Sequence, residues 1–257
     1  MTSLPLPTVI TQQQSLEREI AALRMQLHFE KEARIHAETS LLMQDMAQEN
    51  GDPPASRMAM ITGLAKLADS RDDDTGSRLT RIRQYTAVIA AAVAEHNPQI
   101  LPMGEVSIIA AASILHDIGK VGIADDVLLH PNKLSSAQFE QMKQHAPIGA
   151  DILIALSEQL GPDPWIDTAI QIALGHHERW DGTGYPNGVE ACNIPLAARI
   201  VAVADVYDAL TSERVYKNSI PHQEAVEIIA KEKGKHFDPM VVDAFLSKLE
   251  EVRAINE

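Results

Sequence analysis

The sequence contains histidines and aspartates whose types suit a metal centre. They lie in four short segments: HDIGK at 116–120, HAPIG at 145–149, HHERWDGTGYP at 176–186 and VADVYDALTSERVYK at 203–217. Imidazole and carboxylate together favour Fe, Mn, Zn or Ni over Ca or Mg. These ligands suffice for two metal ions if one carboxylate bridges, and two close metals stabilise an in-line displacement at phosphorus. The candidate ligands are His116, Asp117, His145, His176, His177 and Asp205.

Each of these residues also has a structural explanation when it is taken alone. A His-Asp pair can cap a helix, and a lone histidine such as His145 at a helix junction is more often structural than a ligand. Asp205 and Asp208 lie three residues apart on one face of an apolar helix, where carboxylates need strong partners. Pairing with an arginine such as Arg199 would satisfy them. Only convergence of the four segments on one point favours the metal site.

The elements that must position these residues are predicted to be helices. Apolar residues make up 45% of the chain and aromatic residues only 4%, a balance that suggests helices packed on helices. No convincing strand pair or internal repeat is present. Helical patterns cover about 57–70, 77–96, 104–115, 135–145, 147–160, 164–177, 194–212, 222–233 and 239–249.

The N-terminal part of the chain differs from the rest. Residues 1–10 are predicted to be an irregular tail, 11–49 a helix, 50–56 a linker and 57–257 the main domain. Apolar residues at Leu16, Ile20, Leu23 and Leu27 alternate steps of four and three, as in a coiled coil. Two hypotheses stay open: a coiled coil that forms a homodimer through 11–49, or one amphipathic helix docked on the domain.

Composition excludes several classes of protein. The formal net charge of −14 argues against non-specific nucleic-acid binding, which needs a basic surface. The single cysteine, Cys192, excludes an intrachain disulfide and fits a reducing compartment. No apolar run reaches the roughly 18–20 residues that span a membrane, and the N-terminus lacks the basic start of a signal peptide. We therefore expect a cytoplasmic protein that binds neither membrane nor nucleic acid.

Together the four motifs resemble the HD-GYP subgroup of the HD-domain phosphohydrolases. The resemblance covers about residues 57–250 and excludes the N-terminal helix. It implies an all-α, HD-domain helical bundle, to which the N-terminal helix or coiled coil is an addition. It also implies a phosphodiesterase that hydrolyses the second messenger cyclic di-GMP to pGpG or GMP with two or three divalent metal ions.

The resemblance also implies roles for individual residues. Asp117 would be the carboxylate that bridges two metals. His116 and Asp205 would complete the first metal site, and the remaining histidines would hold the second. Lys120 would act with Asp117 in catalysis by contacting a phosphate. The substrate would be bound by Lys120, Asp208, Arg214, Lys217 and the Gly184-Tyr185-Pro186 loop, which would also dock signalling partner proteins.

One segment departs from the family pattern. A histidine ligand is usual in a segment of the form Thr-Gly-x-His, but here the segment is Thr75-Gly76-Ser77-Arg78. A guanidinium stays protonated and cannot ligate a metal, and it would repel a metal ion nearby. Asp74 replaces the glutamate that often precedes this segment, which argues against a third metal.

Arg78 leaves three hypotheses for the function. The first is a phosphodiesterase that uses two divalent metals, Fe or Mn before Zn or Ni, with Arg78 swung aside or holding a substrate phosphate. The second is a degenerate module that binds nucleotide or a partner protein without turnover. The third is a hydrolase for another phosphorylated nucleotide. The intact Gly-Tyr-Pro loop argues against this third hypothesis.

Overall fold

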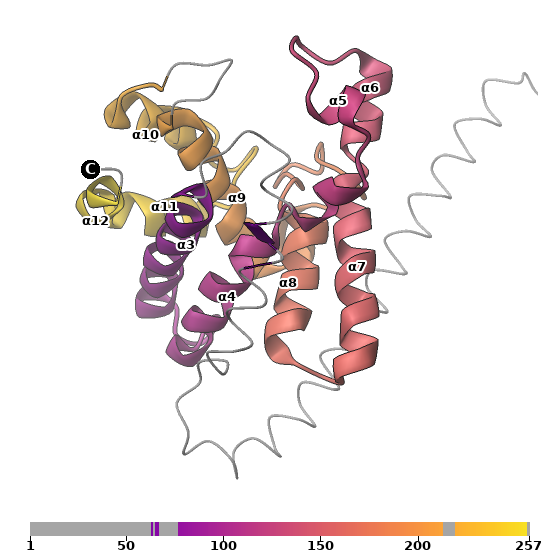
Figure 1. Ribbon diagram of the computed structural model, residues 1–257. Helices are drawn as coiled ribbons and strands as arrows, with labels where there is room; N and C mark the ends of the chain where they lie inside the picture. Colours follow the sequence, from indigo (N-terminus) through magenta and orange to yellow (C-terminus); the bar gives the residue numbers. More distant parts are fainter. Residues whose placement is uncertain (1–62, 64, 67–76, 213–218, 256–257) are drawn as a thin grey trace, which may run out of the picture.

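The computed structural model describes residues 63, 65–66, 77–212 and 219–255, and these residues form an α-helical bundle (Figure 1). Within these ranges the only β-type pairing is an isolated bridge between Lys233 and Phe237. The predicted all-α class is confirmed. The longer helices are α3 (Ser77–His96), α4 (Val106–Ala112), α6 (Ser136–Met142), α7 (His145–Leu160), α8 (Pro164–Gly175), α9 (Leu196–Thr211), α10 (His222–Lys231) and α11 (Pro239–Ser247).

Short elements connect the longer helices. They are the α-helices α5 (Asp125–Leu128) and α12 (Leu249–Ala254) and the 3-10 helices η1 (Met103–Glu105), η2 (Ser113–Leu115), η3 (Ile118–Gly122) and η4 (Ala191–Asn193). The helix expected over 104–115 is therefore α4 followed by a tighter turn. The helix expected over 239–249 is interrupted at Lys248, which has a non-helical backbone, and α12 begins after it. The short helix α5 was not predicted.

Side-chain caps fix where several helices begin. Asp163 accepts a hydrogen bond from the Trp165 amide at 2.9 Å, and Pro164 occupies the first turn of α8. Ser135 and Gln138 form a reciprocal capping box at the start of α6. The helix starts predicted at Ser135 and Pro164 are thus confirmed, and α8 is directed so that its C-terminal end delivers the adjacent histidines.

Helix α8 has a central position in the bundle. It packs against α7, α4 and α9, while α3 packs against α4, α9 and α11 (Figure 1). Apolar side chains from all these helices form one continuous core, in which Tyr207 makes ring contacts with Tyr85 and Phe245. Because the core is continuous, helix ends from distant parts of the sequence are held in fixed relation to one another.

A close backbone approach joins η3 to the start of α7. A Cβ atom on Gly119 would lie 1.9 Å from the carbonyl oxygen of His145 and 2.4 Å from the amide nitrogen of Gly149. Only a residue without a side chain fits there. This contact sets Asp117, two residues before Gly119, beside His145.

The predictions for the N-terminal tail, for the helix at 11–49 and for the linker at 50–56 lie outside the described residues. Of the helix predicted at 57–70, Gly63, Ala65 and Lys66 are described, and all three are helical. No helix in the described part of the chain is both long enough and apolar enough to cross a membrane.

Candidate metal centre

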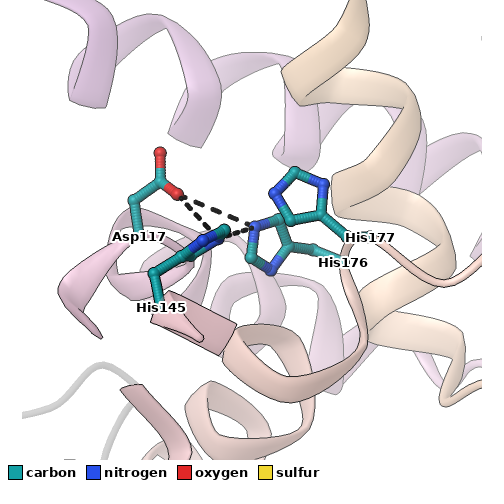
Figure 2. A group of neighbouring side chains, drawn as sticks. All are labelled: Asp117, His145, His176 and His177. Carbon is teal, nitrogen blue, oxygen red and sulfur yellow. Dashed lines mark hydrogen bonds and ion pairs between the residues drawn. The ribbon is translucent and has the colours of Figure 1, made fainter. Parts of the chain in front are cut away.

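Four of the six predicted ligands form a compact cluster (Figure 2). One ligand atom from each of Asp117, His145, His176 and His177 lies within 4.8 Å of all the others. The Nε2 atom of His145 is 3.5 Å from the Nε2 atom of His176, and both face the Oδ1 atom of Asp117, at 3.5 and 3.7 Å. We call these four residues the histidine cage. A metal ion at their centre would have three imidazoles and one carboxylate.

The cage is assembled from element ends. Asp117 lies between η2 and η3, and His145 is the first residue of α7. His176 ends α8, and His177 follows it. Adjacent side chains inside a helix point in different directions, whereas at the end of a helix the backbone can turn. His176 and His177 can therefore both face the cage. The convergence predicted from the four motifs is confirmed for these four residues.

Backbone carbonyls orient the imidazole rings. Nδ1 of His145 lies 2.7 Å from the Met142 carbonyl oxygen, and Nδ1 of His176 lies 3.0 Å from that of Ile172. A carbonyl only accepts hydrogen bonds, so Nδ1 carries the proton in each ring. The lone pair of Nε2 is therefore directed into the cage, as in the usual pattern for metal-ligating histidines.

The protonation states also suit a metal. Burial lowers the pKa of His145 to about 4, and burial with neighbouring imidazoles holds the pKa of His177 well below its usual range. Burial would raise the pKa of Asp117, but the positive charges of Lys120, His116 and Arg78 hold it well below the usual range. At neutral pH the cage thus offers two neutral imidazoles and a carboxylate as ready donors. The donor chemistry fits a divalent transition metal.

The other two predicted ligands face Arg78. The Nη1 atom of Arg78 donates a hydrogen bond to Oδ2 of Asp117 at 3.0 Å, and Nη2 donates to Oδ1 of Asp205 at 2.7 Å. Nη2 also lies 3.3 Å from Nε2 of His116. The Arg78 side chain is 4% exposed. The guanidinium therefore lies among the three residues expected to hold a first metal, and it is not swung aside in this structure.

Asp205 has a clear electrostatic partner. Burial would raise its pKa, but Arg78 lowers it below the usual range, followed by His116. The alternative partner, Arg199, instead donates to Asp238 at 2.5 Å and to the Ile194 carbonyl at 2.8 Å. Six residues along a helix correspond to about 9 Å of rise, which separates Arg199 from Asp205. Pairing of Arg199 with these aspartates was thus a wrong hypothesis.

Asp208 lies deeper than its predicted substrate role suggested. It is fully buried and accepts two hydrogen bonds from Arg81, from Nε at 2.6 Å and from Nη2 at 3.3 Å. Ser212 donates a further one at 3.2 Å. No role for Arg81 was predicted from the sequence. Its spacing was the signal that could have found it. Arg78 and Arg81 lie one helical turn apart, as Asp205 and Asp208 do, so each arginine can face one of the two carboxylates.

Lys120 lies on the same side of Asp117 as Arg78. Its Nζ atom is 3.0 Å from Oδ2 of Asp117, and its side chain is 13% exposed. The two oxygens of Asp117 thus have different surroundings. Oδ1 faces His145 and His176, and Oδ2 faces Arg78, Lys120 and the Nε2 atom of His116.

The Gly-Tyr-Pro loop folds back on the cage. The Tyr185 ring lies 4.6 Å from the His177 ring, and its amide donates to the His177 carbonyl at 3.2 Å. A Cβ atom on Gly184 would lie 2.3 Å from the Arg179 amide nitrogen, so the loop needs glycine there. Pro186 follows Tyr185 through a cis peptide bond. The predicted loop is therefore one wall of the centre.

A buried glutamate closes this loop, and the sequence analysis assigned it no function. Oε1 of Glu178 accepts a hydrogen bond from the Asn187 amide at 2.7 Å. Burial raises the pKa of Glu178 to about 7, against the lowering effect of the backbone amides at 187–189. Glu178 is adjacent to two candidate ligands in the sequence, which was the signal that could have found it.

Phe139 of α6 and Lys143, which follows this helix, also lie beside the Tyr185 ring, with Phe139 partly exposed. Asp74, Arg214 and Lys217 lie outside the described residues.

The fold and the site define an all-α protein with a histidine-rich cluster that could hold a metal ion. The family model described as "HD domain" matches residues 15–241. The chain belongs to the HD domain family and, within it, to the HD-GYP type that its motifs predicted. The HD domains of this family bind divalent metals, and the histidine cage is a cluster among the described residues that could hold one.

Three relatives illustrate the similarity of this chain to known proteins, and all three are from Vibrio cholerae serotype O1. Over 220 residues the chain is 41% identical to a cyclic di-GMP phosphodiesterase, covering 84% of this chain and 44% of the relative. It is 43% identical over 205 residues to a probable cyclic di-GMP phosphodiesterase, covering 79% and 46%. It is 35% identical over 196 residues to a 3'3'-cGAMP-specific phosphodiesterase 2, covering 76% and 35%. The chain spans less than half the length of these relatives.

Proposed function

We propose that this chain is a metal-dependent phosphodiesterase that hydrolyses a 3'-5' phosphodiester bond of cyclic di-GMP. The observation that carries the proposal is the histidine cage, with its unprotonated Nε2 atoms, next to the cations Arg78 and Lys120. The names of two relatives, at 41% and 43% identity, support cyclic di-GMP as the substrate. Hydrolysis would open the ring to pGpG, and a second cut would give GMP.

Asp117, His145, His176 and His177 would hold a divalent metal, which when bound would supply Lewis acidity towards water and towards a phosphoryl oxygen. The chain's own residues do the positioning. Asp117 orients the attacking water, and Lys120 and Arg78 lower the cost of negative charge on the reacting phosphate. The Tyr185 ring, which lies against His177, offers an aromatic face for a guanine base. Arg214 and Lys217 remain proposed phosphate contacts, whereas no substrate contact is proposed for Asp208, which is buried and paired with Arg81.

Three imidazoles and one carboxylate suit Fe, Mn, Zn or Ni, and of these Fe or Mn is proposed before Zn or Ni. A third metal is not proposed, since the segment that would support it contains Arg78. The coiled-coil homodimer through 11–49 and partner docking at the Gly-Tyr-Pro loop remain proposals from the sequence. The single cysteine favours the bacterial cytoplasm.

The test is hydrolysis of cyclic di-GMP by the full chain after loading with Mn²⁺ or Fe²⁺, followed by chromatography of the products. We expect pGpG or GMP, and we expect His145→Ala to abolish both. The 3'3'-cGAMP dinucleotide is assayed in parallel, because one relative is specific for it. Hydrolysis of 3'3'-cGAMP without hydrolysis of cyclic di-GMP would show that the proposed substrate is wrong. No hydrolysis of either at full metal occupancy would refute the enzyme and favour a binding module.

A further inference from the structure

Arg78 occupies the position around which the predicted ligands of a first metal are arranged. We infer that its guanidinium takes the place of one of two metal ions, so that each chain binds a single metal ion, in the histidine cage. The inference rests on the metal centre of the proposed function. It changes the number of metals and gives Arg78 the role of a fixed positive charge.

The contacts of the guanidinium carry the inference. Its nitrogens lie 3.0 Å from Asp117 Oδ2, 2.7 Å from Asp205 Oδ1 and 3.3 Å from His116 Nε2. Metal ligands of these types converge on a common point at about 2.0–2.2 Å. Here hydrogen-bond donors occupy the space between the three ligand atoms. A metal ion could enter only if the buried Arg78 side chain left.

The charges lead to the same result. Asp117 and Asp205 each carry a negative charge in a largely buried site, which must be balanced. Arg78 supplies one permanent positive charge, because a guanidinium does not lose its proton in proteins. Lys120 supplies a second, 3.0 Å from Asp117 Oδ2. Arg78 and Lys120 together provide the two positive charges that a divalent metal would provide, and the Nε2 atom of His116 lies beside them, 3.1 Å from Asp117 Oδ2.

Asp117 connects this cationic position to the histidine cage. Its Oδ2 atom contacts Arg78, Lys120 and, at 3.1 Å, the Nε2 atom of His116, while Oδ1 faces His145 and His176 at 3.5 and 3.7 Å. A carboxylate that bridges two metals divides its oxygens in the same way. The cage therefore keeps its full set of four ligands although the neighbouring position holds an arginine.

The test is the number of metal ions per chain. The full chain is saturated with Mn²⁺, desalted and measured by elemental analysis, with titration calorimetry to count sites. Electron paramagnetic resonance then distinguishes an isolated Mn²⁺ from a coupled pair. We expect one ion and an uncoupled signal for the wild type, and two ions with a coupled signal for Arg78→His. Arg83→His, the same substitution at an exposed position of α3, should keep one ion.

Two ions in the wild-type chain would overturn the inference. This result needs no variant, so it does not depend on whether a variant folds. One ion in a folded Arg78→His chain would overturn it as well. These results are separable from the proposed function. Two ions with turnover would refute the inference and leave the phosphodiesterase standing. One ion without turnover of either dinucleotide would do the reverse.

Discussion

Replacing Gly119 with alanine should damage both the fold and the metal site. The added Cβ would lie 1.9 Å from the His145 carbonyl oxygen and 2.4 Å from the Gly149 amide nitrogen. Both atoms belong to the backbone, so neither can rotate away, and η3 must separate from α7. Overpacking typically costs about 1–3 kcal/mol, and we expect the upper end, about 3 kcal/mol. For a chain of this size that corresponds to a fall in melting temperature of about 6–12 °C.

The metal site should respond because the same separation moves Asp117 away from His145. The measurement is thermal unfolding of the metal-free chain together with the dissociation constant for Mn²⁺. Gly104→Ala is the matched control, because a Cβ there meets no atom within 4 Å. Its stability should be unchanged or slightly raised. A Gly119→Ala chain with the wild-type melting temperature and Mn²⁺ affinity would refute the close approach as the device that positions Asp117.

Two further predictions concern titratable side chains outside the cage, Asp208 and His236. Asp208→Asn should lower the free energy of unfolding by about 3 kcal/mol in urea titrations, because it removes one partner of a buried ion pair with Arg81; unchanged stability would contradict a structural role for the pair. Burial, followed by the charge of Arg179, lowers the pKa of His236 from 6.5 to about 4. Because the unfolded chain binds a proton there that the folded chain does not, His236 reduces stability as pH falls from about 6.5 towards 4. His236→Gln should therefore lose less stability than the wild type over that range in the metal-free state, and parallel stability curves would refute this assignment.

Much of the fold could be predicted because its signals are local. Ser135 and Asp163 begin helices through hydrogen bonds to residues two or three positions away. The break at Lys248 was missed, since an apolar pattern continues across it and the change is confined to one residue's backbone. The short α5 was missed because four residues carry too little pattern.

The candidate site was predictable in part for a different reason. Chemistry limits which residue types hold a metal, and the joint presence of the motifs selected His145, His176, His177 and Asp117 from the ten histidines and the many carboxylates of the chain. Partners of buried charges could not be chosen in this way. Asp205 and Asp208 had several arginines available, and the pairing with Arg78 and Arg81, rather than with Arg199, depends on which faces of α3 and α9 pack together.

The sequence by itself determined the helical class, the residue types of a metal centre and the unusual arginine at position 78. These follow from periodicity, composition and motif, which are properties of short segments. The tertiary structure decided what Arg78 does. The guanidinium reaches Asp117, His116 and Asp205 only because α3 packs against η2 and α9, which brings residues 38, 39 and 127 positions apart within hydrogen-bonding distance. Such contacts depend on the packing of the whole bundle, and no local pattern specifies them.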